Sequence, residues 1–143
     1  MSLMFQPLRK YATFSGRARR KEYWLWQLFV ILLYTALAIW LASTLSPQVI
    51  EKLPDSSAEL WAATSASQLP MAVIGLVSLG LFLPSLAVTV RRIHDSGNSG
   101  WWILLGLTAI GSIVILVFAL IDGTPGPNRY GADPKGRPAP DYK

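Results

Sequence analysis

The sequence contains no cysteine and a single histidine, His94. The absence of cysteine excludes disulfides, thiolate nucleophiles and metal sites with Cys ligands. With one histidine per chain, a site with several histidine ligands could form only between copies of the chain. Charged residues are also scarce, at 15% of the 143 residues, against roughly 25% in a typical soluble chain. These absences exclude more classes of enzyme than any motif in the sequence supports.

Three long apolar runs take up most of the remaining sequence, and the charges are confined to the segments between them. The runs cover residues 24–45, 69–90 and 101–121, and none of them contains Asp, Glu, Lys, Arg or His. About 20 apolar residues in a helix cross a bilayer core of roughly 30 Å, and a helix satisfies its own backbone polar groups there. The sequence therefore predicts an all-α membrane protein with three transmembrane helices and a short cytoplasmic hairpin loop between the second and third.

Two other interpretations of the runs are weaker. Helices in the core of a soluble protein usually keep a polar face at helical period, and none of these runs has one. A cleaved secretory signal has an apolar region of about 7–15 residues, which is shorter than the first run. We therefore expect a basic cytoplasmic N-terminal segment (1–23), a three-helix membrane domain (24–121) and a tail rich in glycine and proline (122–143).

The distribution of the 13 Lys and Arg residues predicts the orientation of the helices. Cytoplasmic segments next to membrane spans are enriched in these residues. The N-terminal segment has six of them, the loop 91–100 has two, the loop 46–68 has one and the tail has four. With three spans, the N-terminus and the loop 91–100 share the more basic side. The N-terminus is therefore predicted to be cytoplasmic and the tail extracytoplasmic, with two or four spans as alternatives.

The loop 46–68 carries a signal of its own. Its residues from Ser56 to Glu59 match a capping box, which favours the start of a helix. A short helix that lies on the membrane surface would account for the match.

The stretch FSGRARRKEYW, from Phe14 to Trp24, is the most distinctive part of the N-terminal segment. A cationic cluster beside an apolar helix favours an anionic membrane surface over nucleic acid as its partner. The simpler interpretation is a topology anchor, because Lys and Arg here would orient the first helix in any case. Glu22 is the exception, since a carboxylate at the entrance of a span needs a cation such as Arg19, Arg91 or Arg92.

The stretch RRIHDSGNSGWW, from Arg91 to Trp102, joins the second and third runs. Gly97 and Gly100 allow a tight turn, and Asn98 or Ser99 can cap the helix that follows. His94 beside Asp95 allows an acid–base interpretation. Adjacent residues seldom form a dyad on their own, so loop ordering and contact with lipid headgroups are the simpler roles.

At three stretches the sequence resembles a known family. The motifs are FSGRARRKEYW before the first run, RRIHDSGNSGWW between the next two, and GTPGPNRYGADP after the last. Together, in this order and around these runs, they are similar to the domain-of-unknown-function 805 family of small bacterial inner-membrane proteins. The resemblance implies a multi-pass location in the bacterial cytoplasmic membrane, without an established activity, and it raises the expectation that the three motifs form a working surface.

We thus expect a non-enzymatic membrane protein with a basic cytoplasmic rim that contacts anionic lipids or a protein partner, and no cofactor, metal or nucleic acid. The predicted rim consists of Arg17, Arg19, Arg20, Glu22, Arg91, Arg92, His94 and Asp95, and the predicted tail motif of Asn128, Arg129 and Tyr130. One alternative is a component of a homo-oligomeric channel or transporter. Another is an enzyme that uses His94 and Asp95 on a lipid headgroup.

Overall fold

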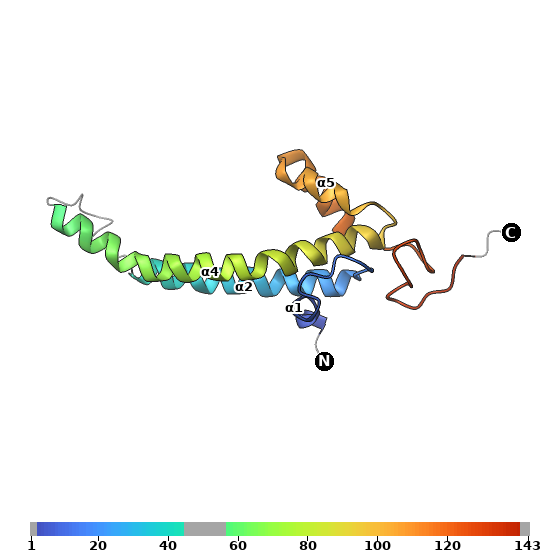
Figure 1. The fold of residues 1–143 in the computed structure, drawn as a ribbon, viewed down its shortest axis with the longest axis horizontal. Coiled ribbons are helices and arrows are strands. Elements are labelled where there is room, and N and C mark those ends of the chain that lie inside the picture. The colour runs from blue at the N-terminus through green and yellow to red at the C-terminus, as the bar shows by residue number, and fades with distance from the viewer. Residues whose placement is uncertain (1–2, 45–56, 141–143) are drawn as a thin grey trace. The chain divides into compact units, whose positions relative to one another are not determined.

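A computed structural model describes residues 3–44 and 57–140, and these residues form helices and irregular segments without a β-strand (Figure 1). The elements are η1 (Leu3–Phe5), α1 (Gln6–Arg9), α2 (Arg20–Thr44), α4 (Ser57–Asp95), η2 (Gly100–Leu107) and α5 (Ala109–Leu120). The predicted all-α class is confirmed.

Two of these helices, α2 and α4, are long and apolar enough to cross a membrane. In α2 this holds for Arg20–Thr44 and in α4 for Ser67–Asp95. Only 6% and 17% of their apolar windows are buried within the chain. Core helices of a soluble protein would bury these side chains, so the exposure favours lipid as the surrounding solvent.

The beginning of α4 corrects the sequence analysis. The predicted separate surface helix in the loop 46–68 is instead continuous with the second apolar run, because α4 begins at Ser57 and continues to Asp95. Its first turns contain several Ala residues with one Glu and one Leu, which all favour helix. Ser56, the first residue of the predicted capping box, lies outside the described residues.

The third apolar run is not one helix, so the prediction of a single continuous helix over 101–121 was wrong. Thr108 has extended backbone (φ −112°, ψ 151°) and separates η2 from α5, and its side chain accepts a hydrogen bond from the N–H of Gly111. A Cβ at Gly111 would lie 1.7 Å from the carbonyl oxygen of Leu105. Only glycine permits this close approach. The capping threonine and the glycine together fold the run into a helical hairpin.

The chain divides into two compact units. The polar unit consists of Met1–Leu28 with Phe82–Lys143, and the apolar unit consists of Phe29–Leu81. In the apolar unit, the hydroxyl of Tyr34 on α2 donates a hydrogen bond of 2.7 Å to Ser78 Oγ on α4. In the polar unit, the indole N–H of Trp26 donates to Ser85 Oγ at 3.0 Å. Each unit thus contains a polar contact between the same two helices.

Candidate functional site

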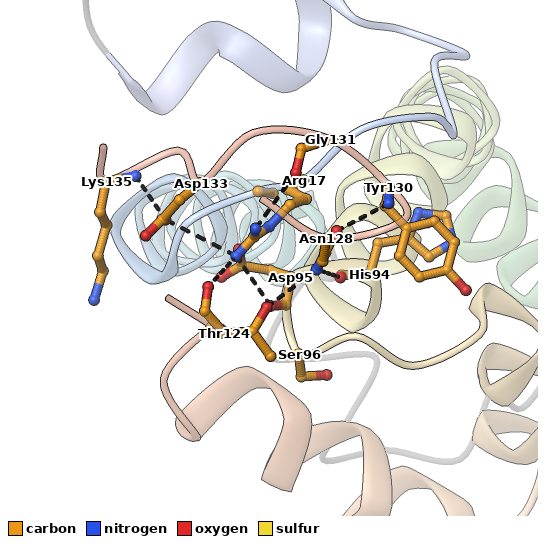
Figure 2. A network of polar contacts seen from close by, with 12 residues as sticks. Arg17, His94, Asp95, Ser96, Thr124, Asn128, Tyr130, Gly131, Asp133 and Lys135 are labelled. Carbon is orange, nitrogen blue, oxygen red and sulfur yellow. Dashed lines mark hydrogen bonds and ion pairs between the residues drawn. The ribbon is translucent and has the colours of Figure 1, made fainter. Parts of the chain in front are cut away.

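The three motifs come together in the polar unit, where they form what we call the polar cluster (Figure 2). Its members are Arg17, Ala18 and Glu22 near the start of α2, Arg91, Arg92, His94 and Asp95 at the end of α4, and Gly123, Thr124, Gly126, Asn128, Tyr130 and Asp133 in the tail.

Arg17 joins α4 to the tail. Its Nε donates to Asp95 Oδ1 at 2.8 Å, and its terminal nitrogens donate to the carbonyl oxygens of Gly126 at 2.7 Å and Thr124 at 2.6 Å. The Arg17 side chain is only 1% exposed. A buried guanidinium is tolerated when its N–H groups are hydrogen-bonded and its charge is paired. Both conditions are met here, as Figure 2 shows.

Asp95 is shared by two cations. While Oδ1 accepts from Arg17, Oδ2 accepts from Arg92 Nη1, and all three side chains are at most 2% exposed. Arg92 also donates to the carbonyl oxygens of Ala18, at 3.2 Å, and of Ile121. The Asp95 carboxylate therefore joins the N-terminal segment to the end of α4, and Arg92 extends the connection to Ile121, the residue that follows α5.

A second buried pair joins α2 to α4. Arg91 Nη1 donates to Glu22 Oε1 at 2.8 Å, and the N–H of Ala18 donates to the carbonyl oxygen of Arg91 at 3.0 Å. The expectation that Glu22 needs a cation is thus met by Arg91. Among the described residues, Nε and Nη2 of Arg91 and Nε of Arg92 are buried without a hydrogen-bond partner.

Asn128 and Tyr130 bind the tail to the loop after α4. The Tyr130 ring stacks on the His94 ring, with centroids 3.8 Å apart and planes at 5°. The Asn128 amide donates to the carbonyl oxygen of His94 at 3.0 Å, and its side-chain oxygen accepts from the N–H of Tyr130 (Figure 2). The N–H of Thr124 also donates to the carbonyl oxygen of Asp95 at 2.9 Å. The tail is therefore ordered by specific contacts.

These contacts place the beginning of the tail beside the N-terminal segment. Arg17 of that segment donates hydrogen bonds to the carbonyl oxygens of Thr124 and Gly126 of the tail. Gly123 makes the close approach possible, because a Cβ there would lie 2.0 Å from Asp95 Oδ2.

Two carboxylates of the tail make further ion pairs. Asp133 accepts from Arg137 Nε at 2.7 Å, and this bond holds the pKa of Asp133 at about 2, below its ordinary 3.8. Asp122 pairs with Lys135, with Arg137 at 3.2 Å and with Arg20 at 3.8 Å. The hydrogen bond from Lys135 lowers the pKa of Asp122.

The predicted rim residues differ in accessibility. Those that are buried are Arg17, Glu22, Arg91, Arg92, His94 and Asp95. Arg19 and Arg20 are partly exposed, and Arg129 is exposed while its Nη2 donates to the carbonyl oxygen of Gly97 at 3.2 Å. Gly97 makes the predicted turn at φ 79°, and Ser99 caps η2 as predicted.

The geometry gives His94 and Asp95 separate partners. The oxygens of Asp95 bind Arg17 and Arg92, whereas His94 Nδ1 lies 3.3 Å from the carbonyl oxygen of Gly16. In catalytic dyads and triads, the base is held within hydrogen-bond reach of the group that it activates or that orients it. In the described part of the chain, no group of three His, Asp or Glu side chains is placed to hold a metal ion.

Sequence reasoning missed several members of the site. Gly123, Thr124 and Asp133 were noted only as positions of the third motif, without a role of their own, and Asp122 and Arg137 only as part of the irregular tail. One available signal was the spacing of Asp133 and Arg137, four residues apart. Another was the location of Gly123 directly after an apolar run.

Fold and site together define an all-helical protein with two helices able to span a membrane and a buried polar cluster built from its three motifs. The family model described as "Protein of unknown function (DUF805)" matches residues 11–132, and the chain belongs to this family.

Two relatives from Escherichia coli strain K12 match over nearly their full length. Inner membrane protein YhaI is 40% identical over 136 residues, which are 94% of this chain and 97% of the relative. Inner membrane protein YhaH is 36% identical over 139 residues, which are 96% of this chain and 100% of the relative. Uncharacterized protein YiiR of the same strain is 28% identical, covering 85% of each chain. No solved structure matches the chain significantly.

Proposed function

We propose that the protein crosses the bacterial inner membrane twice, through α2 and α4, and that residues 100–121 form a re-entrant hairpin. The observation that carries this proposal is that the hairpin begins and ends at the polar cluster. It follows Asp95 closely in the chain, and at its far end the carbonyl oxygen of Ile121 accepts hydrogen bonds from Arg20, at 2.9 Å, and Arg92. A segment with both ends at one place enters and leaves the bilayer on one side.

The charge distribution supports the same topology. With two crossings, the N-terminal segment, the loop 91–100 and the tail share one side, which then holds every Lys and Arg except Lys52. This is a much stronger bias than three crossings would give, and it favours a cytoplasmic location for that side. The names of the relatives YhaH and YhaI support the inner membrane as the location.

A reporter enzyme that is active only in the periplasm, fused after Lys143, tests this topology. The two-crossing topology predicts an inactive fusion, with a control fusion after Thr44 being active. An active fusion after Lys143 would overturn the re-entrant hairpin and restore three crossings.

On this side of the membrane, the protein acts as a non-enzymatic binding protein for anionic lipid headgroups. The buried arginines already bind Glu22, Asp95 and backbone carbonyls, so contact with headgroups falls to cations outside the cluster. Lys10 and Lys21 are exposed and Arg19 is partly exposed, and all three belong to the basic N-terminal segment. A cation near an anionic leaflet contributes about 1 kcal/mol to binding.

Native mass spectrometry of the protein released from nanodiscs of mixed anionic and zwitterionic phospholipid tests this function. Replacing Arg19 and Lys21 with Gln should lower the retention of anionic lipid by about fivefold per cation. The matched control is Lys135→Gln, since Lys135 is exposed but already pairs with Asp122. Unchanged retention would contradict the proposal, and a defined oligomer without retained lipid would favour the channel alternative.

A further inference from the structure

The polar unit contains a cavity of about 560 Å³ beside the polar cluster. Its apolar walls come from the N-terminal segment, the last turns of α4 and η2, and consist of Phe14, Leu86, Val90, Trp101, Ile103 and Leu104. Cavities of roughly 300–1,000 Å³ with a mainly apolar lining are typical of sites for small molecules.

Polar groups complete the lining at the stacked pair of His94 and Tyr130, joined by Ser99. A cation lies beside this pair, because the guanidinium carbon of Arg129 is 4.8 Å from the centre of the Tyr130 ring. Figure 2 shows the two rings face to face. The cavity thus combines an apolar wall with a few polar groups, and a positive charge lies beside one of its lining residues. This combination fits a ligand that is an anionic amphiphile.

We infer that this cavity binds one acyl chain of an anionic phospholipid, with the phosphate beside Arg129. The inference rests on the proposed function, which supplies the membrane and the preference for anionic lipid. Two lining residues of η2 are exposed, Trp101 at 78% and Leu104 at 54%. If the hairpin lies in the bilayer, these side chains face lipid, and a chain can enter the cavity from the membrane. Close packing of its methylenes against the apolar walls then stabilises the complex.

The test is photo-crosslinking in proteoliposomes with a phosphatidylglycerol that carries a photoactivatable acyl chain, followed by peptide mapping. On the wild-type protein, we expect the label to concentrate on the cavity walls in α4 and η2, and an excess of unlabelled phosphatidylglycerol should compete it away. Equal labelling of the apolar face of α5 and of the cavity walls would overturn the inference.

Leu86→Trp fills the cavity and should abolish the label on η2. The matched control is Leu79→Trp, since Leu79 lies on the same helix, is 73% exposed and does not line the cavity. It should leave the label on η2 unchanged. Persistent labelling of η2 in Leu86→Trp, with the thermal stability of the wild type, would contradict the inference.

The preference for a negative headgroup is tested with Arg129→Gln and with a phosphatidylcholine probe that has the same chains. An exposed ion pair contributes about 0.2–1 kcal/mol, so each change should lower the cavity label by up to about fivefold. If the wild type with the phosphatidylglycerol probe, Arg129→Gln with that probe and the wild type with the phosphatidylcholine probe are labelled equally, Arg129 does not belong to the site. If anionic lipid is still retained through Arg19 and Lys21 while the cavity stays unlabelled, this inference fails and the proposed function stands.

Discussion

The polar and apolar units differ in what holds their helices together. In the polar unit, buried ion pairs such as Arg17–Asp95 and Arg91–Glu22 connect segments that are 69 to 78 residues apart in the chain. In the apolar unit, the two helices share the Tyr34–Ser78 hydrogen bond, and large side chains such as Leu76 (71%) and Leu79 (73%) are exposed. The same two helices are therefore held in different ways along their length.

The difference follows from the surrounding solvent. Lipid chains are as apolar as leucine, so burial of apolar side chains gives little net attraction between helices in a bilayer. Specific structure must then come from close packing and from polar groups that have no better partner. The polar unit has such groups and folds three segments around Asp95. The apolar unit is a helical pair whose surface is left to lipid.

The largest expected effect comes from removing the carboxylate at the centre of the polar unit. Asp95→Asn leaves Arg17 and Arg92 buried without their shared anion, and breaking a buried ion pair costs about 3–5 kcal/mol. Thermal unfolding in detergent should show a large loss of stability. Asp122→Asn is the control, because the Asp122 side chain is 46% exposed and its ion pairs are worth about 1 kcal/mol at most. Equal losses of stability in both variants would show that the buried ion pairs contribute no more than the exposed ones.

A pair of glycine substitutions compares packing in the two units. Gly123→Ala would place a Cβ 2.0 Å from Asp95 Oδ2 and should destabilise the protein by about 1–3 kcal/mol through overpacking. Gly75→Ala, on α4 in the apolar unit, meets no atom within 4 Å and should leave stability unchanged or raise it by up to about 1 kcal/mol. The same unfolding experiment measures both, and a loss of stability is expected only for Gly123→Ala.

Acid should weaken the polar unit before the apolar unit. Asp133 has a pKa of about 2 in the folded protein against 3.8 ordinarily, so it contributes stability that is complete above pH 3.8. That contribution is lost as the pH falls from 3.8 towards 2. The free energy of unfolding should therefore fall as the pH is lowered through this range, and Asp133→Asn should make this dependence on pH weaker. Asp122, whose pKa is also lowered, accounts for part of the dependence that is left in the variant. An unchanged dependence on pH in Asp133→Asn would contradict the assignment.

The smallest effect is expected in the apolar unit. Tyr34→Phe removes the hydrogen bond to Ser78, and such bonds between membrane helices contribute about 0.6 kcal/mol on average. The free energy of unfolding should therefore decrease only slightly. A loss as large as that of Asp95→Asn would show that the apolar unit also depends on its polar contact.

The composition was sufficient to predict the helical class and both long helices. Runs of about 20 residues without charge have few alternatives. Helix α2 contains the first predicted run as far as Thr44, the last described residue of that run, and α4 contains the second. The prediction of one continuous helix failed for the third run because the hydropathy of the run does not reveal a local signal within it. Thr108 caps α5, and Gly111 permits the backbone to fold back on Leu105. A hydropathy pattern treats both residues as ordinary members of a span.

The three motifs were also recognisable, but their relation was not. Sequence reasoning assigned Arg17, Arg92 and Asp95 to an accessible rim, because charged side chains are normally exposed. The burial of Arg17 depends on Thr124 and Gly126, whose carbonyl oxygens accept hydrogen bonds from it. These partners lie more than a hundred residues away along the chain. Backbone carbonyls carry no sequence signal, so a pairing of this kind becomes visible only in the folded chain.

The most direct test of the claim that buried ion pairs hold the three segments together is a double-mutant cycle on Arg17 and Asp95. The free energy of unfolding is measured for the wild type, Arg17→Gln, Asp95→Asn and the double variant. Residues in direct contact couple by about 0.5–3 kcal/mol. Our account predicts a coupling in the upper half of that range, with the double variant less destabilised than the sum of the single variants. Additive losses would contradict it.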